Sequence, residues 1–211
     1  MDSKSQSPRN NYHVGNLSAQ LLSAARTMLE AVGSTKLSVR ALCSGLGVTP
    51  TAAYYHFSNR TDLLAQLATQ GYLELAQVLD KEAAALPMED KIRGFCLTYL
   101  NFARDNPALY QLMFGPELAL ENMPDTLREA RQLAFSKLEE MVADLLKQPI
   151  NTPDVRGAAL ASWSYIHGLT ALLQHKVLQR PAEVSDQRLI ERTLLGFEVL
   201  FKAHAESIRS M

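Results

Sequence analysis

Residues 38–60, SVRALCSGLGVTPTAAYYHFSNR, contain the start and stop signals of two short helices in succession. Ser38 is a good N-cap residue, because its hydroxyl can accept a backbone N–H that the first helical turn leaves unpaired. Apolar residues then recur at helical spacing, at Val39, Leu42 and Leu46. Gly47 is suited to end this helix, since glycine adopts a left-handed backbone without a Cβ penalty.

A second helix is predicted directly after this turn. Thr49 is another N-cap residue, and Pro50 follows at the first helical position, where its missing N–H is no loss. We therefore predict a helix over residues 50–57. Two short helices joined by a tight glycine turn form a helix-turn-helix, whose second helix enters the major groove of DNA while the first crosses the backbone.

The side chains of the second helix suit that role. Short residues near its start would let the backbone approach base edges, and polar or aromatic residues could reach phosphates and thymine methyl groups. Residues of these kinds are Thr51, Ala52, Tyr54, Tyr55 and His56. Arg40, early in the first helix, could donate two parallel hydrogen bonds to a guanine.

A third helix is predicted to begin behind an Asn59 N-cap, which Asp62 completes three residues later. Arg60 at its start is expected to point its cation at the DNA backbone. An alternative interpretation is that Tyr54, Tyr55 and Phe57 only fill the core of a small helical bundle. The agreement of caps, turn glycine and aromatic spacing favours DNA binding, with Phe57 and Ala53 as core residues.

In these residues the chain resembles the DNA-binding domain of the tetracycline-repressor (TetR) family of bacterial regulators. The resemblance covers roughly residues 14–75, and it rests on Ser38-Val39-Arg40, Leu46-Gly47-Val48-Thr49 and Ala53-Tyr54-Tyr55-His56-Phe57, with Arg60 three residues later. It implies base contacts by Arg40, Pro50, Thr51 and Tyr54. It implies contacts to phosphates or the groove wall by Thr49, Ala52, Tyr55, His56 and Arg60, and Ser38 completes the predicted DNA-binding set. Two positions depart from the family pattern, because Ala52 lacks the hydroxyl of a Thr or Ser, and Arg60 stands where Lys is more frequent.

Composition and charge agree with a DNA reader joined to a different domain. The chain has 211 residues, 47% of them apolar, which is enough for one or two domains with a core. Residues 1–60 contain six basic and two acidic side chains, whereas the rest contains 15 basic and 20 acidic ones. A basic head on an acidic body is typical of such a protein.

The location of the chain is predicted from what it lacks. Cys43 and Cys96 show no metal or redox spacing, so we expect free thiols in a reducing cytosol. There is no apolar run of membrane-spanning length and the N-terminus is polar, which predicts a cytoplasmic protein that does not contact membranes.

Hydrophobic periodicity predicts an all-α fold of about nine helices, with no β-alternating stretch. We expect a disordered tail over residues 1–15, a three-helix head over residues 16–75 and a larger helical body over residues 76–211. The predicted helices after the helix-turn-helix span residues 59–79, 89–105, 107–114, 125–147 and 154–179, and a last one starts at a Ser185 cap. In the helix over residues 59–79, Arg60 and Leu79 would lie about 28 Å apart at ~1.5 Å per residue, so the helix could act as a lever between head and body.

The body also resembles a subgroup of TetR-type regulators named for a Trp, a His and a Gly, here Trp163, His167 and Gly168, preceded by residues 106–115. The resemblance implies a body that dimerises and holds a small-molecule pocket. Trp163 and His167 are four residues apart and share one helical face. The predicted ligand-binding residues are Tyr99, Phe102, Tyr110, Met113, Phe114, Trp163 and His167. The alternative is that this aromatic cluster is ordinary core.

We expect a homodimer formed through the last two helices, where small residues allow close approach and apolar residues supply area. The small residues are Gly157, Ala158, Ala161, Gly168 and Gly196; the apolar ones, with Thr193, are Leu189, Phe197, Leu200 and Phe201. Twofold symmetry predicts a palindromic double-stranded DNA operator with half-sites about 34–36 Å apart, or a multiple of that.

No hydrolase, zinc-protease or phosphate-loop motif is present, and the five histidines are scattered singly. We therefore expect no enzymatic activity, no cofactor and no metal. The prediction is a sequence-specific transcriptional regulator, a repressor released by an unknown small apolar or amphipathic effector. The alternatives are an activator of the same fold, a small-molecule-binding or enzymatic body fused to a DNA-binding head, or a helical scaffold that binds only protein.

Overall fold

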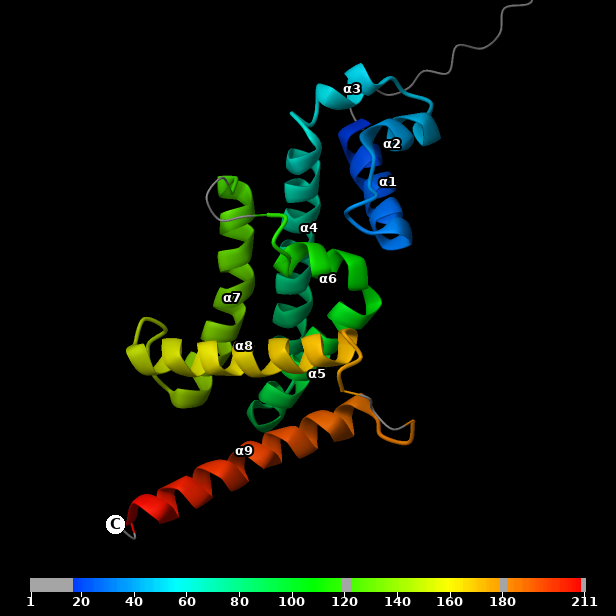
Figure 1. The fold of residues 1–211 in the computed structure, drawn as a ribbon. Helices are drawn as coiled ribbons and strands as arrows, with labels where there is room; N and C mark the ends of the chain where they lie inside the picture. Colours follow the sequence, from blue (N-terminus) through cyan, green and yellow to red (C-terminus); the bar gives the residue numbers. More distant parts are fainter. Residues whose placement is uncertain (1–16, 119–122, 179–181, 210–211) are drawn as a thin grey trace, which may run out of the picture. The chain divides into compact units, whose positions relative to one another are not determined.

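A computed structural model describes residues 17–118, 123–178 and 182–209, and over these ranges the chain is helical without strands (Figure 1). The predicted all-α fold is confirmed. In the last helix, side chains are described up to Gly196 and at Val199. The predicted tail over residues 1–15 and the side chains of Phe197, Leu200 and Phe201 therefore lie outside the described part. No described helix is long and apolar enough to cross a membrane.

The chain divides into two compact units, one up to Leu67 and one from Ala68. The first unit contains α1 (Leu17–Val32), α2 (Val39–Leu46), α3 (Pro50–Tyr54) and the first turns of α4 (Arg60–Ala85). Its core is apolar and includes Leu21, Ala25, Leu29, Leu42, Cys43, Ala53, Phe57, Leu63, Leu64 and Leu67. The division lies within α4, and the expected domain limits of 16–75 and 76–211 stay a prediction.

The caps of the helix-turn-helix form as predicted. Ser38 accepts a hydrogen bond from the backbone N–H of Ala41 at 3.4 Å, and Thr49 accepts one from Ala52 at 3.3 Å. Gly47 has φ 68°, and the N–H that follows it donates to the Cys43 carbonyl at 3.0 Å. This is the backbone arrangement that lets glycine close a helix end.

The second helix of this motif is shorter than predicted, because α3 ends at Tyr54 rather than at residue 57. The N–H groups of His56 and Phe57 both donate to the Ala53 carbonyl, at 2.9 and 3.0 Å. Sharing one acceptor tightens the last turn and ends the regular helix. Phe57 is only 1% exposed, so the chain leaves the helix where this ring enters the core.

The second unit holds the rest of α4 and five further α-helices. They are α5 (Lys91–Asp105), α6 (Pro107–Phe114), α7 (Asp125–Leu146), α8 (Pro153–Gln174) and α9 (Asp186–Arg209), with a 3₁₀ turn at Met88–Asp90 before α5. The bounds of α6 are as predicted. Three other bounds differ by more than one residue, since α4 continues six residues beyond residue 79, α5 begins after the 3₁₀ turn, and α8 ends at Gln174 rather than at residue 179.

The early end of α8 has a local cause. Lys176 adopts a left-handed backbone with φ 56°, the N–H of Val177 donates to the Leu172 carbonyl at 3.0 Å, and that of Lys176 donates to the Leu173 carbonyl at 3.1 Å. These bonds satisfy carbonyls that the last turn would leave free. A lysine occupies the position that glycine usually takes, so the sequence contains no stop signal there.

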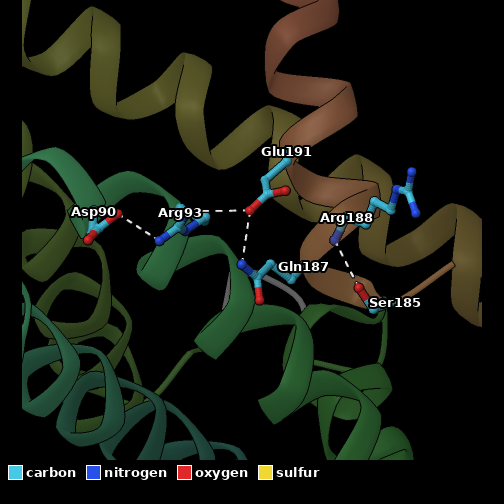
Figure 2. Close-up of polar contacts among 6 residues, drawn as sticks. All are labelled: Asp90, Arg93, Ser185, Gln187, Arg188 and Glu191. Carbon is cyan, nitrogen blue, oxygen red and sulfur yellow. Dashed lines mark hydrogen bonds and ion pairs between the residues drawn. The ribbon is translucent and has the colours of Figure 1, made fainter.

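The start of α9 is held by polar contacts (Figure 2). Ser185 caps the helix by accepting from the N–H of Arg188 at 3.2 Å, as predicted. Arg93 of α5 pairs with Glu191 at 3.3 Å and with Asp90 at 2.7 Å. The hydroxyls of Tyr165 and Thr193 join α8 to α9 at 2.6 Å. Figure 1 shows the ribbon of α9 diverging from that of α8 toward the C-terminal end of α9.

Candidate functional site

The predicted DNA-binding residues of the first unit lie mostly at its surface. Tyr54 is 50% exposed and Tyr55 is 88% exposed, so the interpretation that both only fill the core is wrong. Ala52 and His56 are half-buried, while the other predicted contacts of the turn and helices are exposed, namely Ser38, Arg40, Thr49, Pro50 and Thr51. The helix-turn-helix therefore presents these side chains for contact, with Ala53 and Phe57 buried as core.

Arg60 has a role that the sequence did not indicate. Its Nε donates to the Leu37 carbonyl at 3.1 Å, and one terminal nitrogen donates to the Ser34 carbonyl. These bonds tie the start of α4 to the turn between α1 and α2. Arg60 therefore has an internal bracing role, and its predicted contact with the DNA backbone stays a prediction for its remaining nitrogen.

The N-terminus of α4 positions Arg60. The side chain of Asn59 accepts from the N–H of Asp62 at 2.9 Å, and the Asp62 carboxylate accepts from the N–H of Ser58 at 2.8 Å. The predicted cap is confirmed. The carboxylate of Asp62 in this cap also lies at the positive, N-terminal end of the α4 helix dipole.

In the second unit, four of the predicted ligand-binding residues form a hydrogen-bonded network. The Trp163 indole N–H donates to the Tyr99 hydroxyl at 3.3 Å, and the hydroxyls of Tyr99 and Tyr110 lie 3.1 Å apart. Nδ1 of His167 lies 2.6 Å from the Tyr110 hydroxyl and 3.1 Å from that of Tyr99. Residues from α5, α6 and α8 are joined in this way.

The protons of this network can be assigned from burial. Burial lowers the pKa of His167 and raises the pKa values of Tyr99 and Tyr110, so the ring is neutral and both hydroxyls keep their protons. We assign Tyr110 as donor to His167 Nδ1 and Tyr99 as donor to Tyr110, which leaves the ring proton on Nε2. The polar groups of Tyr99, Tyr110 and Trp163 are then all satisfied within the protein.

An inner cavity lies beside this network. It is lined by Tyr72, Leu75, Leu79, Phe95, Tyr99, Phe114, Arg131, Ala134, Phe135, Leu138 and Trp163. Its volume is about 30 Å³, which is room for about one water molecule. Pockets for small organic ligands are roughly ten times larger or more. The cavity is therefore too small for such a ligand in this structure, and a ligand would have to move part of its wall.

A larger outer hollow shares Phe114 with the inner cavity as a lining residue. It has a volume of about 340 Å³ and is lined by Tyr110, Gln111, Phe114, Gly115, Pro116, His167, Ala171, Gln174 and His175. The ring centre of Phe114 is 4.7 Å from those of Tyr110 and His167, and 5.5 Å from that of Tyr72. Because Phe114 lines both spaces, its side chain separates the hollow from the inner cavity.

Two predicted pocket residues line neither space. Phe102 is buried in the core of the second unit. Met113 packs against α4, since its sulfur occupies the space beside Gly71 and its carbonyl accepts the Tyr72 hydroxyl at 2.6 Å. Neither residue lines one of these two spaces, and their predicted contact with a ligand stays a prediction.

Several lining residues were missed, including Tyr72, Phe95, Arg131 and Phe135. They come from α4, α5 and α7, and no local motif relates them. Arg131 is one of several charged residues of α7, and nothing in the sequence around it distinguishes it from the others. Among the described residues, no cluster of His, Cys, Asp or Glu could hold a metal.

A capped helix-turn-helix unit followed by a helical body with an internal cavity defines a DNA-binding protein with an appended helical domain. Residues 21–67 match the family model described as bacterial regulatory proteins, tetR family, and residues 92–197 match the tetracyclin repressor-like C-terminal domain. The second match alone spans half of the chain. The chain belongs to the TetR family.

The similarity to individual curated proteins is low, with sequence identities below 30%. The chain is 29% identical over 136 residues to the nucleoid occlusion factor SlmA of Vibrio vulnificus YJ016, which is 61% of this chain and 66% of that protein. It is 28% identical over 102 residues to the HTH-type transcriptional regulator Rv1816 of Mycobacterium tuberculosis H37Rv, covering 47% and 44% of the two chains. The chain thus spans less than two thirds of the length of these curated relatives.

Solved structures show the same fold. A protein of unknown function from Rhodococcus sp. RHA1 superposes with a TM-score of 0.76 at 24% identity, over 88% of this chain and 95% of that one. A putative transcriptional regulator from Pseudomonas aeruginosa PAO1 superposes with a TM-score of 0.64 at 16% identity, over 90% and 97%. At such identities the likeness is one of fold.

Proposed function

We propose that this protein is a ligand-responsive, sequence-specific DNA-binding regulator of transcription, and that it acts as a repressor. The observation that supports this most directly is the exposed surface of the helix-turn-helix, which offers Arg40, Thr51 and Tyr54 to base edges. Tyr55 and Thr49 would contact phosphates. Membership of the TetR family supports the same function.

In the proposed switch, the first event is the entry of a ligand into the inner cavity. A ligand that enters through the outer hollow must displace Phe114, which is the last residue of α6. Helix α6 packs on α4 at Gly71 without room for a Cβ atom, so α6 cannot shift without moving α4. Because α4 is one continuous helix that also carries residues of the first unit, its movement would change how the recognition helices meet DNA.

The proposed assembly is a homodimer formed through α8 and α9. These helices carry large apolar residues that are exposed in the single chain, namely Leu160, Leu172, Leu195 and Val199. Pairing two copies would bury this area and give a twofold axis. The operator would then be a palindrome whose half-sites match the spacing of the two α3 helices.

The test begins with selection of bound sequences from a genomic library, followed by fluorescence anisotropy on the selected site at two salt concentrations. We expect binding that strengthens at low salt, and a cost of ~1–3 kcal/mol for Arg40→Ala that depends on one base position. Tyr55→Ala should weaken all sequences alike. Arg188→Ala is the matched control, because it removes the same charge from an exposed site in the body. Equal, weak binding of all DNA by every variant would contradict the proposal.

The proposed release of a repressor by an effector can be tested separately. An effector that weakens operator binding must itself be bound more weakly by the operator complex, by the same factor. Titration of an effector with and without operator DNA measures both factors. Equal effector affinity in the two titrations would remove the ligand response from the proposal.

A further inference from the structure

We propose that the inner cavity binds an organic anion with an apolar body, and that Arg131 is the residue that holds its negative group. This deepens the proposed function and rests on it, because it names the chemical class of the effector. The charge on Arg131, the absence of an acidic partner for it among the described residues and the occupied state of the other polar groups in the wall carry the proposal.

Arg131 lies in the cavity wall without a carboxylate partner. Its guanidinium carbon lies 5.7 Å from the centre of the Tyr72 ring, and one terminal nitrogen is 3.6 Å from the sulfur of Met123, a weak acceptor. Among the described residues, no acidic side chain lies within ion-pair distance of it. Its neighbours three and four residues away on α7 are Leu127, Arg128, Ala134 and Phe135.

Two other arginines, Arg128 and Arg156, have the acidic partners that Arg131 lacks among the described residues. Arg128, one turn earlier on α7, pairs with Asp125, and Arg156 pairs with Glu139 at 2.6 Å. Both of those side chains are more than half exposed, whereas Arg131 is half-buried. Within the described residues, two arginines that water could solvate have acidic partners, whereas Arg131, which faces a largely apolar space, has none. Burying a charge without a partner is costly, so a ligand that brings the opposite charge is favoured there.

The other polar side chains in the cavity wall already form hydrogen bonds within the protein. The Tyr72 hydroxyl donates to the Met113 carbonyl at 2.6 Å, the Trp163 indole donates to Tyr99, and the Tyr99 hydroxyl belongs to the network with Tyr110 and His167. Arg131 itself contacts the Tyr72 hydroxyl and the Met123 sulfur, but a guanidinium has five N–H donors, so of the described lining residues it still has donors to offer. Its planar fork can give two parallel hydrogen bonds to a carboxylate, sulfonate or phosphate.

The remaining wall suits an apolar body. Leu75, Leu79, Phe95, Phe135 and Leu138 contribute only hydrocarbon and aromatic surface. A ligand of this class would displace the Phe114 ring to gain volume and would then place its charge at Arg131. Both ends of an amphipathic anion are therefore matched by groups of the same cavity.

Trp163 provides the readout, because it is the only tryptophan of the chain and lines the cavity. Decanoate and 1-decanol have chains of equal length and differ in the charged head group. Titration of the full-length protein with each probe, followed by Trp163 fluorescence, measures the preference for the anion. We expect decanoate to bind at least about tenfold more tightly than decanol, since a hydrogen bond to a charged group contributes ~1.5–3 kcal/mol.

Three variants identify the anchor. Arg131→Gln should reduce decanoate affinity about tenfold or more and leave decanol affinity unchanged within about threefold. Arg131→Lys keeps the charge and should retain part of the preference, which guards against a loss due to misfolding. Arg128→Gln removes the neighbouring arginine and should change neither affinity.

The proposal is overturned if wild type binds neither probe, binds both alike, or if Arg131→Gln and Arg128→Gln have the same effect. Selection of DNA sites with the same proteins separates this result from the function. If a specific operator is selected but decanoate is not preferred, the anchor fails and the regulator stands. If decanoate binds through Arg131 but no DNA is selected, the anchor stands and the regulator fails.

Discussion

The guanidinium of Arg60 braces the turn between α1 and α2 through the carbonyls of Leu37 and Ser34. Replacing it by glutamine leaves two partly buried carbonyls without these donors, and an unsatisfied buried group costs ~1–3 kcal/mol. We expect Arg60→Gln to lower the free energy of unfolding of the first unit by about 1–3 kcal/mol, measured by urea denaturation.

Arg40 offers the matched control. Its side chain is exposed on α2, so Arg40→Gln should change the unfolding free energy by less than about 0.5 kcal/mol while weakening operator binding. The same loss of stability in both variants would show that the two contacts of Arg60 do not brace the turn. Together, the variants Arg60→Gln and Arg40→Gln distinguish an arginine with a structural role from one that contacts DNA bases.

His167 predicts a dependence of stability on pH. Burial lowers its folded pKa below the value of ~6.5 in an unfolded chain, and the hydroxyls of Tyr99 and Tyr110 are the groups that face its Nδ1. The unfolded chain therefore binds more protons between the two pKa values. The stabilisation is complete above pH ~6.5 and is lost as the pH falls through the lower folded pKa.

The check compares wild type with His167→Gln by urea denaturation over the acidic range. We expect the stability difference between the two proteins to shrink as the pH falls from neutrality. A difference that is constant with pH would mean that His167 titrates normally. His175→Gln, at an exposed position after α8, is the control that should leave the slope unchanged.

At the scale of elements, the contact of α4 with α6 depends on one missing side chain. A Cβ atom at Gly71 would lie 2.6 Å from the Met113 sulfur and 2.8 Å from Cδ2 of Leu109. Overpacking of this kind costs ~1–3 kcal/mol, although alanine is the better helix former. We expect Gly71→Ala to lower the thermal unfolding midpoint, measured by circular dichroism.

Gly45→Ala is the control for helix propensity, because a Cβ at Gly45 of α2 meets no atom within 4 Å. There the alanine should stabilise by up to ~1 kcal/mol. If Gly71→Ala were stabilising too, α6 would not be held tightly on α4. The proposed transmission of a shift from α6 to α4 would then lose its structural basis.

At the scale of the whole molecule, exposed apolar residues on α9 predict a partner. Leu195 and Val199 are 58% and 67% exposed in the single chain. We expect wild type to sediment at twice the monomer mass at micromolar concentration. Leu195→Asp should shift it toward the monomer, because a buried unpaired charge at an interface is costly.

Leu133→Asp is the control for this experiment, since Leu133 is an exposed leucine of α7, outside the proposed interface. It should leave the mass unchanged. A wild-type protein that sediments as a monomer would contradict the dimer. A dimer that both variants leave intact would place the interface elsewhere.

Local sequence signals predicted the fold well where a structural element depends on residues close to it in the chain. The Ser38, Thr49 and Ser185 caps, the Gly47 turn and the bounds of α6 all follow from interactions within about one helical turn. The end of α8 could not be predicted from such local signals, because Lys176 adopts the left-handed conformation that sequence reading assigns to glycine.

The sequence by itself therefore determined the all-α class, the helix-turn-helix and the family, since periodicity, caps and motif spacing are short-range properties. Only the tertiary structure decided which aromatic residues line the cavity and that Trp163 and His167 are hydrogen-bonded to tyrosines. It also decided that Arg131 lies in the cavity wall with no acidic partner in the described part of the chain. These properties depend on side chains from α4, α5, α6, α7 and α8 that meet only when the helices pack. No pattern along the chain records which charge will lack a partner once water is excluded.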